Sequence, residues 1–474
     1  MKVLLVYPPA RDASVFPLGL AYIASYLRKN GHEVELLDFT VRQLSGAELS
    51  AEIKQFNKYD CIGISAIITA YNFVKEFSKH VKSHFPNLPV VVGNAISIAC
   101  PATLLKNSDV DIVVADEGEL TASELINSIK EPGKFKYIKG IWYKENGQIH
   151  QTPPRERIKN LDSLPYPSWN LIDMPFYMKH AGAYLERGLR TGWVSPVRGC
   201  PFSCGFCSRP FAQTITYRSP NSIIDEILEF KRIYNNTHVK LVADEFMVNI
   251  DMVKNFAKSL LERKIKITWE ANGRVNFADI DLFRLMRKSG CISLSYGIES
   301  GSQKILNNMN KMATVEQSRK AIELTRKAGI TARTPFMFGY IGEDKATIAD
   351  TVNFIKQAKL GVTRLFFTTP YPGTALYNWA LQNNRIKYEE DVYLSLLGNN
   401  AEKFLVNLTD MPDEELVRLK AETESELRKL LGLKMKIKYG LKRINYIKAK
   451  ISQLGVAGTF KKAVNKLFGF KKHV

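Results

Sequence analysis

The sequence is short of cysteine, and it has no long apolar run. Only six cysteines occur among 474 residues, which is too few for a small disulfide-stabilised secreted protein. No stretch of about 18 uncharged apolar residues is present, so no membrane-spanning helix is predicted. Residues 1–9 are typical of a strand entering a turn and not of a signal peptide. These features together predict a cytoplasmic protein.

Acidic residues are missing altogether after Glu426, where fourteen lysines and arginines remain. Taking these fourteen from the net charge of +20 leaves +6 for the rest of the chain, so the positive charge belongs to one tail. Apolar residues recur in this tail at helical spacing, at Leu433, Ile437, Leu441, Ile444 and Ile451. The pattern indicates a basic amphipathic segment.

Three roles are open for this basic tail. It can lie on an anionic membrane surface, which would place the protein peripherally on the inner face of the membrane. It can instead cover the preceding domain with a lysine-rich outer face. Nucleic-acid binding is the least favoured, because aromatic and basic residues are not interleaved as base stacking requires.

Half of the cysteines lie within eight positions, at Cys200, Cys204 and Cys207. Neighbouring glycines let the backbone turn around a small object, so three thiolates can converge on one inorganic centre. A zinc site would normally use a fourth ligand at similar spacing, but the next cysteine is Cys291. A 4Fe-4S cluster held by three cysteines leaves one iron open, which suits a reactive cluster. Zinc and purely structural thiols are the alternatives.

The chain before the cysteines divides into a domain and a linker. Apolar runs alternate with helical segments at 2–7, 33–38, 61–66, 90–92 and 111–115. This alternation predicts a Rossmann-like, doubly wound domain over residues 1–135, with its ligand crevice at the carboxyl ends of the strands. Residues 136–190 contain a hairpin pattern and a proline-rich extended stretch, which indicate a linker.

The cysteines open a second α/β region. Its apolar runs are 193–197, 239–242, 267–270, 292–297, 332–337 and 364–369, with helical segments between them. Six such strands predict a partial (β/α)6 barrel over residues 191–385. Residues 386–474 form a helical C-terminal region that includes the basic tail. The fold class is therefore α/β, with a helical end.

The spacing Cys-x3-Cys-x2-Cys resembles the signature of the radical SAM superfamily, and the likeness covers roughly the first 385 residues. The resemblance implies a 4Fe-4S cluster that donates an electron to S-adenosylmethionine (SAM), yielding methionine and a 5′-deoxyadenosyl radical. The open iron would chelate the amino and carboxylate groups of SAM. The resemblance also implies an electron donor such as flavodoxin or ferredoxin, and Phe206 would shield the cluster from water.

Residues that follow successive barrel strands are the candidate SAM contacts, because a ligand sits at the carboxyl ends of parallel strands. By resemblance, Asp244 and Glu245 receive the SAM ammonium; alternatively they are charges at a helix N-terminus. Arg274 is a candidate for the SAM carboxylate. Glu299 is a candidate for the ribose or amino group, or else forms an ion pair with Arg274.

Two further positions are less specific. After the fifth run come Gly339, Ile341 and Gly342, where the missing side chains of the two glycines would let a flat adenine approach the backbone. Arg198, just before the cysteines, either offsets the charge of the cluster or is a solvated loop residue.

The first domain resembles the cobalamin-binding domain of one radical SAM group, which includes anaerobic magnesium-protoporphyrin cyclases and cobalamin-dependent methylases. The resemblance rests on the turn at 8–9, the stretch 16–20 and the Glu-Gly-Glu of 117–119. The Asp-x-His-x-x-Gly motif that ligates cobalt elsewhere is missing, and residues 93–97 lack the Gly-Gly and His that the group would have. The domain therefore either binds cobalamin without a protein ligand or has lost it and only packs against the barrel.

With cobalamin bound, the resemblance implies methylation of an unactivated carbon: the adenosyl radical removes a hydrogen and methylcobalamin supplies the methyl group. The substrate would be a small molecule or a lipid. The alternative is radical cyclisation, oxidation or coupling of a lipid or tetrapyrrole-like substrate without methyl transfer. A second alternative is a non-catalytic, membrane-associated iron-sulfur protein. The series of acidic and glycine residues at strand ends favours an enzyme, because an electron carrier needs no SAM pocket.

Overall fold

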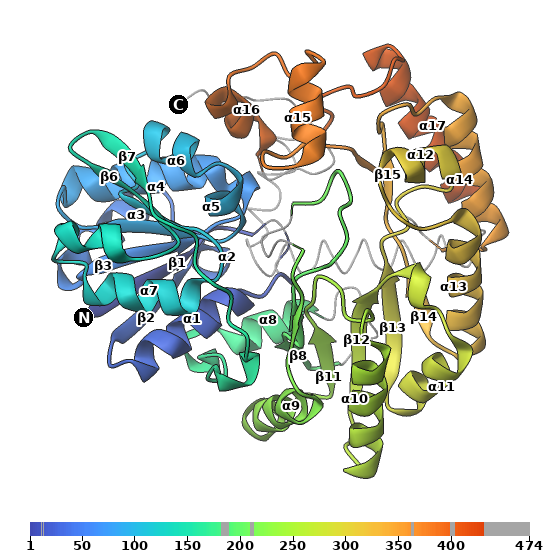
Figure 1. Cartoon of the computed structure of the whole chain (residues 1–474), viewed down its shortest axis with the longest axis horizontal. Coiled ribbons are helices and arrows are strands. Elements are labelled where there is room, and N and C mark those ends of the chain that lie inside the picture. The colour runs from blue at the N-terminus through green and yellow to red at the C-terminus, as the bar shows by residue number, and fades with distance from the viewer. Residues whose placement is uncertain are drawn as a thin grey trace.

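Two α/β domains and a helical C-terminal segment make up the computed structural model (Figure 1). The described residues are 1–10, 12, 14–181, 189–208, 213–361, 365–398 and 403–430. The amphipathic tail predicted beyond residue 430 lies outside them, as does Arg364 at the start of the sixth predicted run. Across the described ranges, no helix combines the length and the apolar composition that crossing a membrane requires.

The first domain is built on one sheet with the strand order β2-β1-β3-β4-β5-β6-β7. The strands are β1 (Lys2–Tyr7), β2 (Glu33–Asp38), β3 (Cys61–Ser65), β4 (Val90–Gly93), β5 (Ile112–Val114), β6 (Ile141–Glu145) and β7 (Gln148–Gln151). Strands β1 to β5 are parallel, and the antiparallel pair β6 and β7 extends the sheet at β5. The sheet thus continues past residue 135, where the sequence placed the end of the domain, because the hairpin pairs with the free edge of β5.

Helices cover both faces of this sheet. Successive side chains of a strand point to opposite sides, so Val3 and Leu5 pack beneath α1 and α7, whereas Leu4 and Val6 pack beneath α4 and α6. The helices of the domain are α1 (Leu18–Lys29), α2 (Phe39–Arg42), α3 (Gly46–Ile53), α4 (Tyr71–His84), α5 (Ala95–Ala99), α6 (Pro101–Asn107) and α7 (Gly118–Asn127). Burial on both faces explains why the strands are continuous apolar runs without a polar alternation.

The linker fills the space between the domains with aromatic side chains. Trp169 and Tyr177, the latter in α8 (Met174–Ala181), join a core cluster with Phe16 of the first domain and Trp193 of the second. The rings of Phe16 and Trp193 stack with their centroids 4.7 Å apart. The linker therefore packs as part of an interdomain core.

The second domain carries a parallel five-stranded sheet in the order β14-β13-β12-β11-β8. Its strands are β8 (Thr191–Val194), β11 (His238–Leu241), β12 (Thr268–Gly273), β13 (Cys291–Tyr296) and β14 (Thr331–Arg333). The helices that follow them are α9 (Pro220–Tyr234), α10 (Ile250–Glu262), α11 (Ile280–Lys288), α12 (Gln303–Asn308), α13 (Val315–Lys327) and α14 (Lys345–Gln357). Two short strands, β9 (Val197–Arg198) and β10 (Thr216–Tyr217), pair antiparallel beside the sheet.

The fifth predicted strand, over residues 332–337, is in fact two strands. β14 ends at Arg333, and β15 (Phe336–Phe338) leaves the sheet to pair with β16 (Leu365–Phe367). Pro335 lies at the break, and it has no N–H to donate to a ladder. β15 nevertheless stays beside the segment that follows β13, because Phe336 forms a parallel bridge with Glu299.

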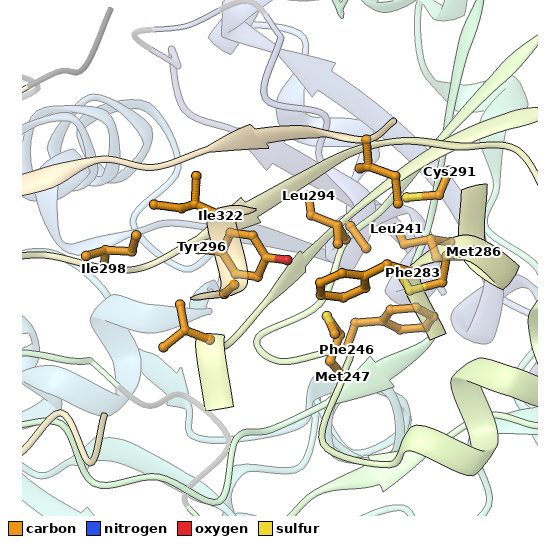
Figure 2. Packing of buried hydrophobic residues seen from close by; sticks show 14 of the residues in the cluster. Leu241, Phe246, Met247, Phe283, Met286, Cys291, Leu294, Tyr296, Ile298 and Ile322 are labelled. Atoms are coloured by element: carbon orange, nitrogen blue, oxygen red, sulfur yellow. The ribbon is translucent and has the colours of Figure 1, made fainter. Parts of the chain in front are cut away.

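The core of the barrel lies between the sheet and its outer helices. Figure 2 shows buried side chains of this cluster, among them Phe283 and Met286 of α11 facing Leu241 of β11 and Leu294 of β13. These helices pack on the sheet because their apolar residues recur on one face, as the positions 282, 283 and 286 of α11 illustrate.

The C-terminal helices connect the two domains. They are α15 (Ala375–Gln382), α16 (Glu390–Leu397) and α17 (Asp413–Leu430). Helix α16 packs against α4 and α6 of the first domain, and Lys75 of α4 pairs with Asp391 at 2.6 Å. Helix α17 packs against α14 on the opposite side of the molecule (Figure 1). The region predicted as helical therefore covers the barrel and holds the first domain at the same time.

Candidate cofactor site

The three clustered cysteines lie on the loop that joins β9 to β10. Cys204 is buried, Cys200 is half-buried and Cys207 is exposed. Gly199 begins the loop with a φ of +90°, and a Cβ there would overlap the carbonyl oxygen of Thr214. Only glycine can therefore start the turn that presents Cys200.

Neighbouring segments fix the shape of this loop. The N–H of Gly205 donates to the carbonyl of Met309 (2.9 Å), and the carbonyl of Gly205 accepts from the N–H of Leu376 at the start of α15 (2.9 Å). The side-chain amide of Asn310 donates to the carbonyl of Ser203 at 3.0 Å. The loop is thus held between the turn after α12 and the helix α15.

The donor set of the loop fits an iron-sulfur cluster. Among the described side chains, no three from His, Cys, Asp or Glu are gathered as metal ligands, so the thiols share one loop without converging on a point. Burial raises the pKa of the Cys200 thiol, and burial together with the neighbouring Cys204 and Cys200 raises that of Cys207 to about 11. Bound iron would stabilise the thiolates that this environment disfavours.

The two carboxylates after β11 differ in their contacts. Asp244 accepts the N–H of Gly199 at 2.9 Å and so holds the start of the cysteine loop. Glu245 is buried and accepts the N–H of Met247 at 3.0 Å. Burial raises the pKa of Glu245 to about 7, although the charge of Arg274 acts in the opposite direction. Neither residue is in the first turn of α10, which begins only at Ile250, so the helix-dipole alternative does not apply.

Arg274 lies directly against the cysteine loop. Its guanidinium donates to the sulfur of Cys204 at 3.5 Å and also to the carbonyl of Lys311, and it stacks on Phe202 with 3.6 Å to the ring centroid. A buried cation in this position would offset negative charge on thiolates that hold a cluster.

Glu299 pairs with Lys311, at 3.2 Å, and not with Arg274 as the alternative held. Its φ of +68° is unusual for a residue with a side chain and costs conformational energy, as backbone at functional sites often does. Lys311 is buried and lies 5.5 Å from the ring centroid of Phe206. Lys311 is not among the predicted residues, because it follows the helix α12 and not a strand; the Asn-rich stretch 307–310 before it indicates a turn.

The space beside Gly339 is occupied by another element of the protein. Gly339 has a φ of +81°, but the space that a side chain would occupy is taken by Leu416 of α17, 3.3 Å from the Cβ position. The carbonyl of Ile341 accepts from the Asn308 amide at 2.9 Å, and the same amide fills the space beside Gly342. Protein groups therefore fill the side-chain space at both glycines, and the adenine contact stays a prediction.

Arg198 is not a solvated loop residue. It is buried, and its guanidinium donates to Glu117 at 3.0 Å and to Glu119 at 2.6 Å. Both glutamates come from the segment after β5 of the first domain, and the sequence indicated neither as a partner of Arg198 because they are 81 and 79 positions away.

The carboxyl edge of the first sheet exposes uncharged groups. Ile67, after β3, is 54% exposed, and Pro9 and Asn94 at the ends of β1 and β4 are also exposed. Asn94 has a φ of +78° and caps α5, where the histidine of the group is missing. A large exposed aliphatic side chain at a ligand-binding edge fits a bulky, largely apolar ring such as a corrin.

Comparison with known proteins agrees with this arrangement. Residues 194–355 match the family model of the radical SAM superfamily, and residues 11–126 match that of the B12 binding domain. The chain is 32% identical over 394 residues to an uncharacterized methyltransferase of Pyrococcus horikoshii, with 81% of this chain and 84% of the relative covered. It is 27% identical over 393 residues to the anaerobic magnesium-protoporphyrin IX monomethyl ester cyclase of Rubrivivax gelatinosus, covering 80% and 69%.

A solved structure shares the fold. The radical S-adenosylmethionine methyltransferase TsrM from Kitasatospora setae, solved with cobalamin and a 4Fe-4S cluster, superposes with a TM-score of 0.69 at 18% identity, over 82% of this chain and 76% of that one. At this identity the likeness is one of fold alone.

The fold and the cysteine loop define a cluster-bearing enzyme with a B12 binding domain at its N-terminal side. The chain belongs to the radical SAM superfamily. Its cofactors are a 4Fe-4S cluster, SAM and cobalamin, as predicted, so the non-catalytic and cofactor-free alternatives are set aside. Such an enzyme acts on a small-molecule substrate and needs an electron donor.

Proposed function

We propose that this enzyme methylates an unactivated carbon of a small-molecule substrate. The observation that carries the proposal is the buried contact between its two cofactor regions: Arg198, two positions before Cys200, is bound to Glu117 and Glu119 of the B12 binding domain. A methyl group carried on one side and a substrate radical made on the other must meet, which needs the two sites to be neighbours. The Pyrococcus horikoshii relative and TsrM are both named methyltransferases.

The roles of the residues follow from their positions. When bound, the cluster and SAM supply a hydrogen-abstracting radical and cobalamin supplies the methyl group. We assign Cys200, Cys204 and Cys207 to the cluster, and Arg274 to offsetting charge at the Cys204 sulfur. Glu245, Glu299 and Lys311 would hold the charged amino and carboxylate groups of SAM, because an acidic and basic set with little exposure to water can pair with both groups; Glu245 and Lys311 are buried and Glu299 is half-buried.

Two of the residues predicted to contact a cofactor are assigned an indirect role, because they contact other residues of the protein. Phe206 packs against Tyr340, with ring centroids 6.4 Å apart, and would shield a bound cluster from water on that side. Asp244 holds the N–H of Gly199 and so positions the loop. In this proposal Gly339 and Ile341 lie beside bound SAM, and Leu416 of α17 packs against Gly339.

Anaerobic reconstitution tests the proposal. The protein, loaded with iron, sulfide and cobalamin, is expected to show a corrin absorption spectrum and to release 5′-deoxyadenosine from SAM with dithionite. With methyl-labelled SAM and candidate substrates, label should appear in the product. The triple variant with Cys200, Cys204 and Cys207 changed to Ala should release none. Deoxyadenosine from that variant would overturn the assignment of the cluster, and an unlabelled, cyclised or oxidised product would favour the chemistry of the cyclase relative.

We further propose that the basic tail holds the enzyme on an anionic membrane surface. Its support is the composition of the tail. After Glu426 there are fourteen basic residues and no acidic one, and apolar residues recur among them at helical spacing. Wild-type protein should sediment with vesicles that contain anionic lipid and stay in solution with neutral vesicles or at high salt. A chain lacking residues 434–474 should not sediment with either. Equal binding of both chains would contradict the proposal, and loss of solubility on truncation would favour a tail that covers the barrel.

A further inference from the structure

The cysteine loop is held at both of its ends by buried arginines that reach the first domain. Arg198 ends β9 immediately before the loop, and Arg218 follows β10 immediately after it. β9 and β10 pair with each other, Arg198 opposite Thr216 and Val197 opposite Tyr217, so the two arginines extend from one short ladder. Both ends of the loop therefore leave from the β9–β10 ladder, and this ladder is bound to the first domain through the two arginines.

The Arg198 end binds two carboxylates. The guanidinium donates to both oxygens of Glu119, at 2.6 and 3.2 Å, and to one oxygen of Glu117 at 3.0 Å. The side chains are 10%, 4% and 5% exposed for Arg198, Glu119 and Glu117. The second oxygen of Glu117 accepts the N–H of Ile158 in the linker at 2.7 Å. A forked donor between two carboxylates, away from water, has one good geometry and little freedom to move.

The Arg218 end binds a carboxylate of its own domain and a hydroxyl of the first. Arg218 forms an ion pair with Glu226 of α9, which is fully buried, and it donates to the hydroxyl of Tyr22 in α1 at 3.2 Å. The same hydroxyl lies 3.0 Å from Glu226. The two ends are thus held by different elements, α7 with its preceding turn and α1, which pack on the same face of the first sheet.

The loop cannot turn about its arginine end without breaking other contacts. The residue between Arg198 and Cys200 is Gly199, whose conformation no side chain allows and whose N–H is held by Asp244. A shift of Glu117 and Glu119 relative to the barrel would consequently move the backbone of Cys200. Both glutamates start the helix α7 directly after β5, at the carboxyl edge where a Rossmann-like domain holds its ligand.

We propose that Arg198, bound to Glu117 and Glu119, is a positioning residue that fixes the cluster relative to the cobalamin site. The inference concerns the distance between the two cofactors and does not require that the reaction be methyl transfer. Loosening this contact should leave the cysteines able to bind a cluster, while the separation of the two metal centres becomes variable.

The test uses the holoenzyme with the cluster reduced and cobalamin in its paramagnetic Co(II) state, and measures the magnetic interaction between the two spins. Wild type should give one well-defined interaction. Glu119→Gln, and more strongly the double variant Glu117→Gln with Glu119→Gln, should give a broadened or weakened interaction at unchanged iron and cobalamin content. Glu124→Gln is the matched control: it lies on the same helix α7 and pairs with Arg155 of the linker, but it does not contact the cysteine loop.

An unchanged, well-defined interaction in the double variant would overturn the proposal, as would equal broadening in Glu124→Gln. If the double variant does not fold, Arg198→Lys decides, because an ammonium keeps the charge but cannot bridge both carboxylates as a fork. A wild-type interaction in Arg198→Lys would then count against the proposal. Release of deoxyadenosine by these variants reports on the function separately, since it needs the cluster and SAM but no fixed cobalamin.

Discussion

The two ligand-binding edges of the molecule differ in their charge. At the barrel edge, two carboxylates and two cations lie within one domain: Glu245, Arg274 and Lys311 are buried, and the half-buried Glu299 pairs with Lys311. At the edge of the first sheet the charges are already paired with partners outside the domain. Glu117 binds Arg198, Asp116 binds Arg157, and Asp38 accepts a hydrogen bond from Tyr177. What the first edge leaves exposed is Ile67, Pro9 and Asn94.

The difference matches the chemistry of the two ligands. The amino and carboxylate groups of SAM gain most from fixed opposite charges in a site without water. A corrin ring offers a broad uncharged face, for which apolar contact and open space matter more. Under the proposed assignment the chain places its two sites at the same kind of sheet edge, and charged groups of the first domain pair with the linker and the barrel.

Removing the charged groups at the barrel edge is expected to have the largest effect. Lys311→Met leaves the half-buried Glu299 without its cation, and Glu299→Gln removes a charge that SAM would meet. Each should raise the KM for SAM by roughly 10- to 100-fold, because a buried hydrogen bond to a charged group contributes about 1.5–3 kcal/mol. Initial rates of deoxyadenosine release at varied SAM concentration measure this.

The control for this prediction is Lys304→Met, whose side chain pairs with Asp344 on the surface. It should leave the KM for SAM unchanged. A KM in Lys311→Met equal to that of wild type would show that the barrel edge does not bind SAM through these charges, and the contrast between the two edges would lose its chemical meaning.

Placing a charge at the first edge is expected to have a smaller effect on a different ligand. Ile67→Asp would set a carboxylate against an uncharged ring, and partial desolvation of that carboxylate should weaken cobalamin binding by about tenfold. An absorbance titration of the cluster-free protein with cobalamin measures the affinity. Deoxyadenosine release should stay near the wild-type rate, since Ile67 belongs to the other edge.

Val417→Asp is matched to this change, because Val417 is 43% exposed on α17, away from the first sheet. It should bind cobalamin as wild type does. If Ile67→Asp also binds with wild-type affinity, the exposed apolar edge is not the cobalamin surface.

The elements were largely predictable from sequence because their signals are local. β1, β2 and α1 have the predicted bounds, since each is a continuous apolar or helical pattern that ends in a turn. The division of residues 332–337 was visible at Pro335 but was outweighed by the apolar residues around it. The place of the 141–151 hairpin was not visible, because strand pairing at a free edge depends on which edge is free after folding.

The site was predictable only where function follows strand ends. Glu245 and Arg274 lie in the region expected for them, and their SAM contacts stay predictions. Lys311 and the partners of Arg198 could not be predicted, for one physical reason. An ion pair forms between groups that the fold brings together, and neither the spacing nor the composition of the sequence indicates which groups these are. The filling of the space at Gly339 by Leu416 is of the same kind, since the glycine and the leucine lie on different elements.

The smallest predicted effect concerns a buried carboxylate that belongs to neither edge. Glu343 accepts the N–H of Gly339, and burial raises its pKa from 4.5 to about 7. Between these pH values the folded protein keeps a proton that the unfolded chain has released, so this group stabilises the fold at low pH and loses that contribution as the pH rises to about 7. The loss is at most about 3 kcal/mol.

Glu343→Gln, which keeps the acceptor but cannot ionise, should remove this part of the pH dependence. Urea unfolding of wild type and variant at about pH 5 and pH 7.5 measures it: the variant should gain stability relative to wild type at the higher pH, and less so at the lower. Asp410→Asn, a change in a carboxylate that is 92% exposed, should leave the pH dependence as it is. If the difference in stability between wild type and Glu343→Gln does not grow with pH, the Glu343 carboxyl is not protonated in the folded protein. Its burial, with α17 packed over the turn, would then not raise its pKa.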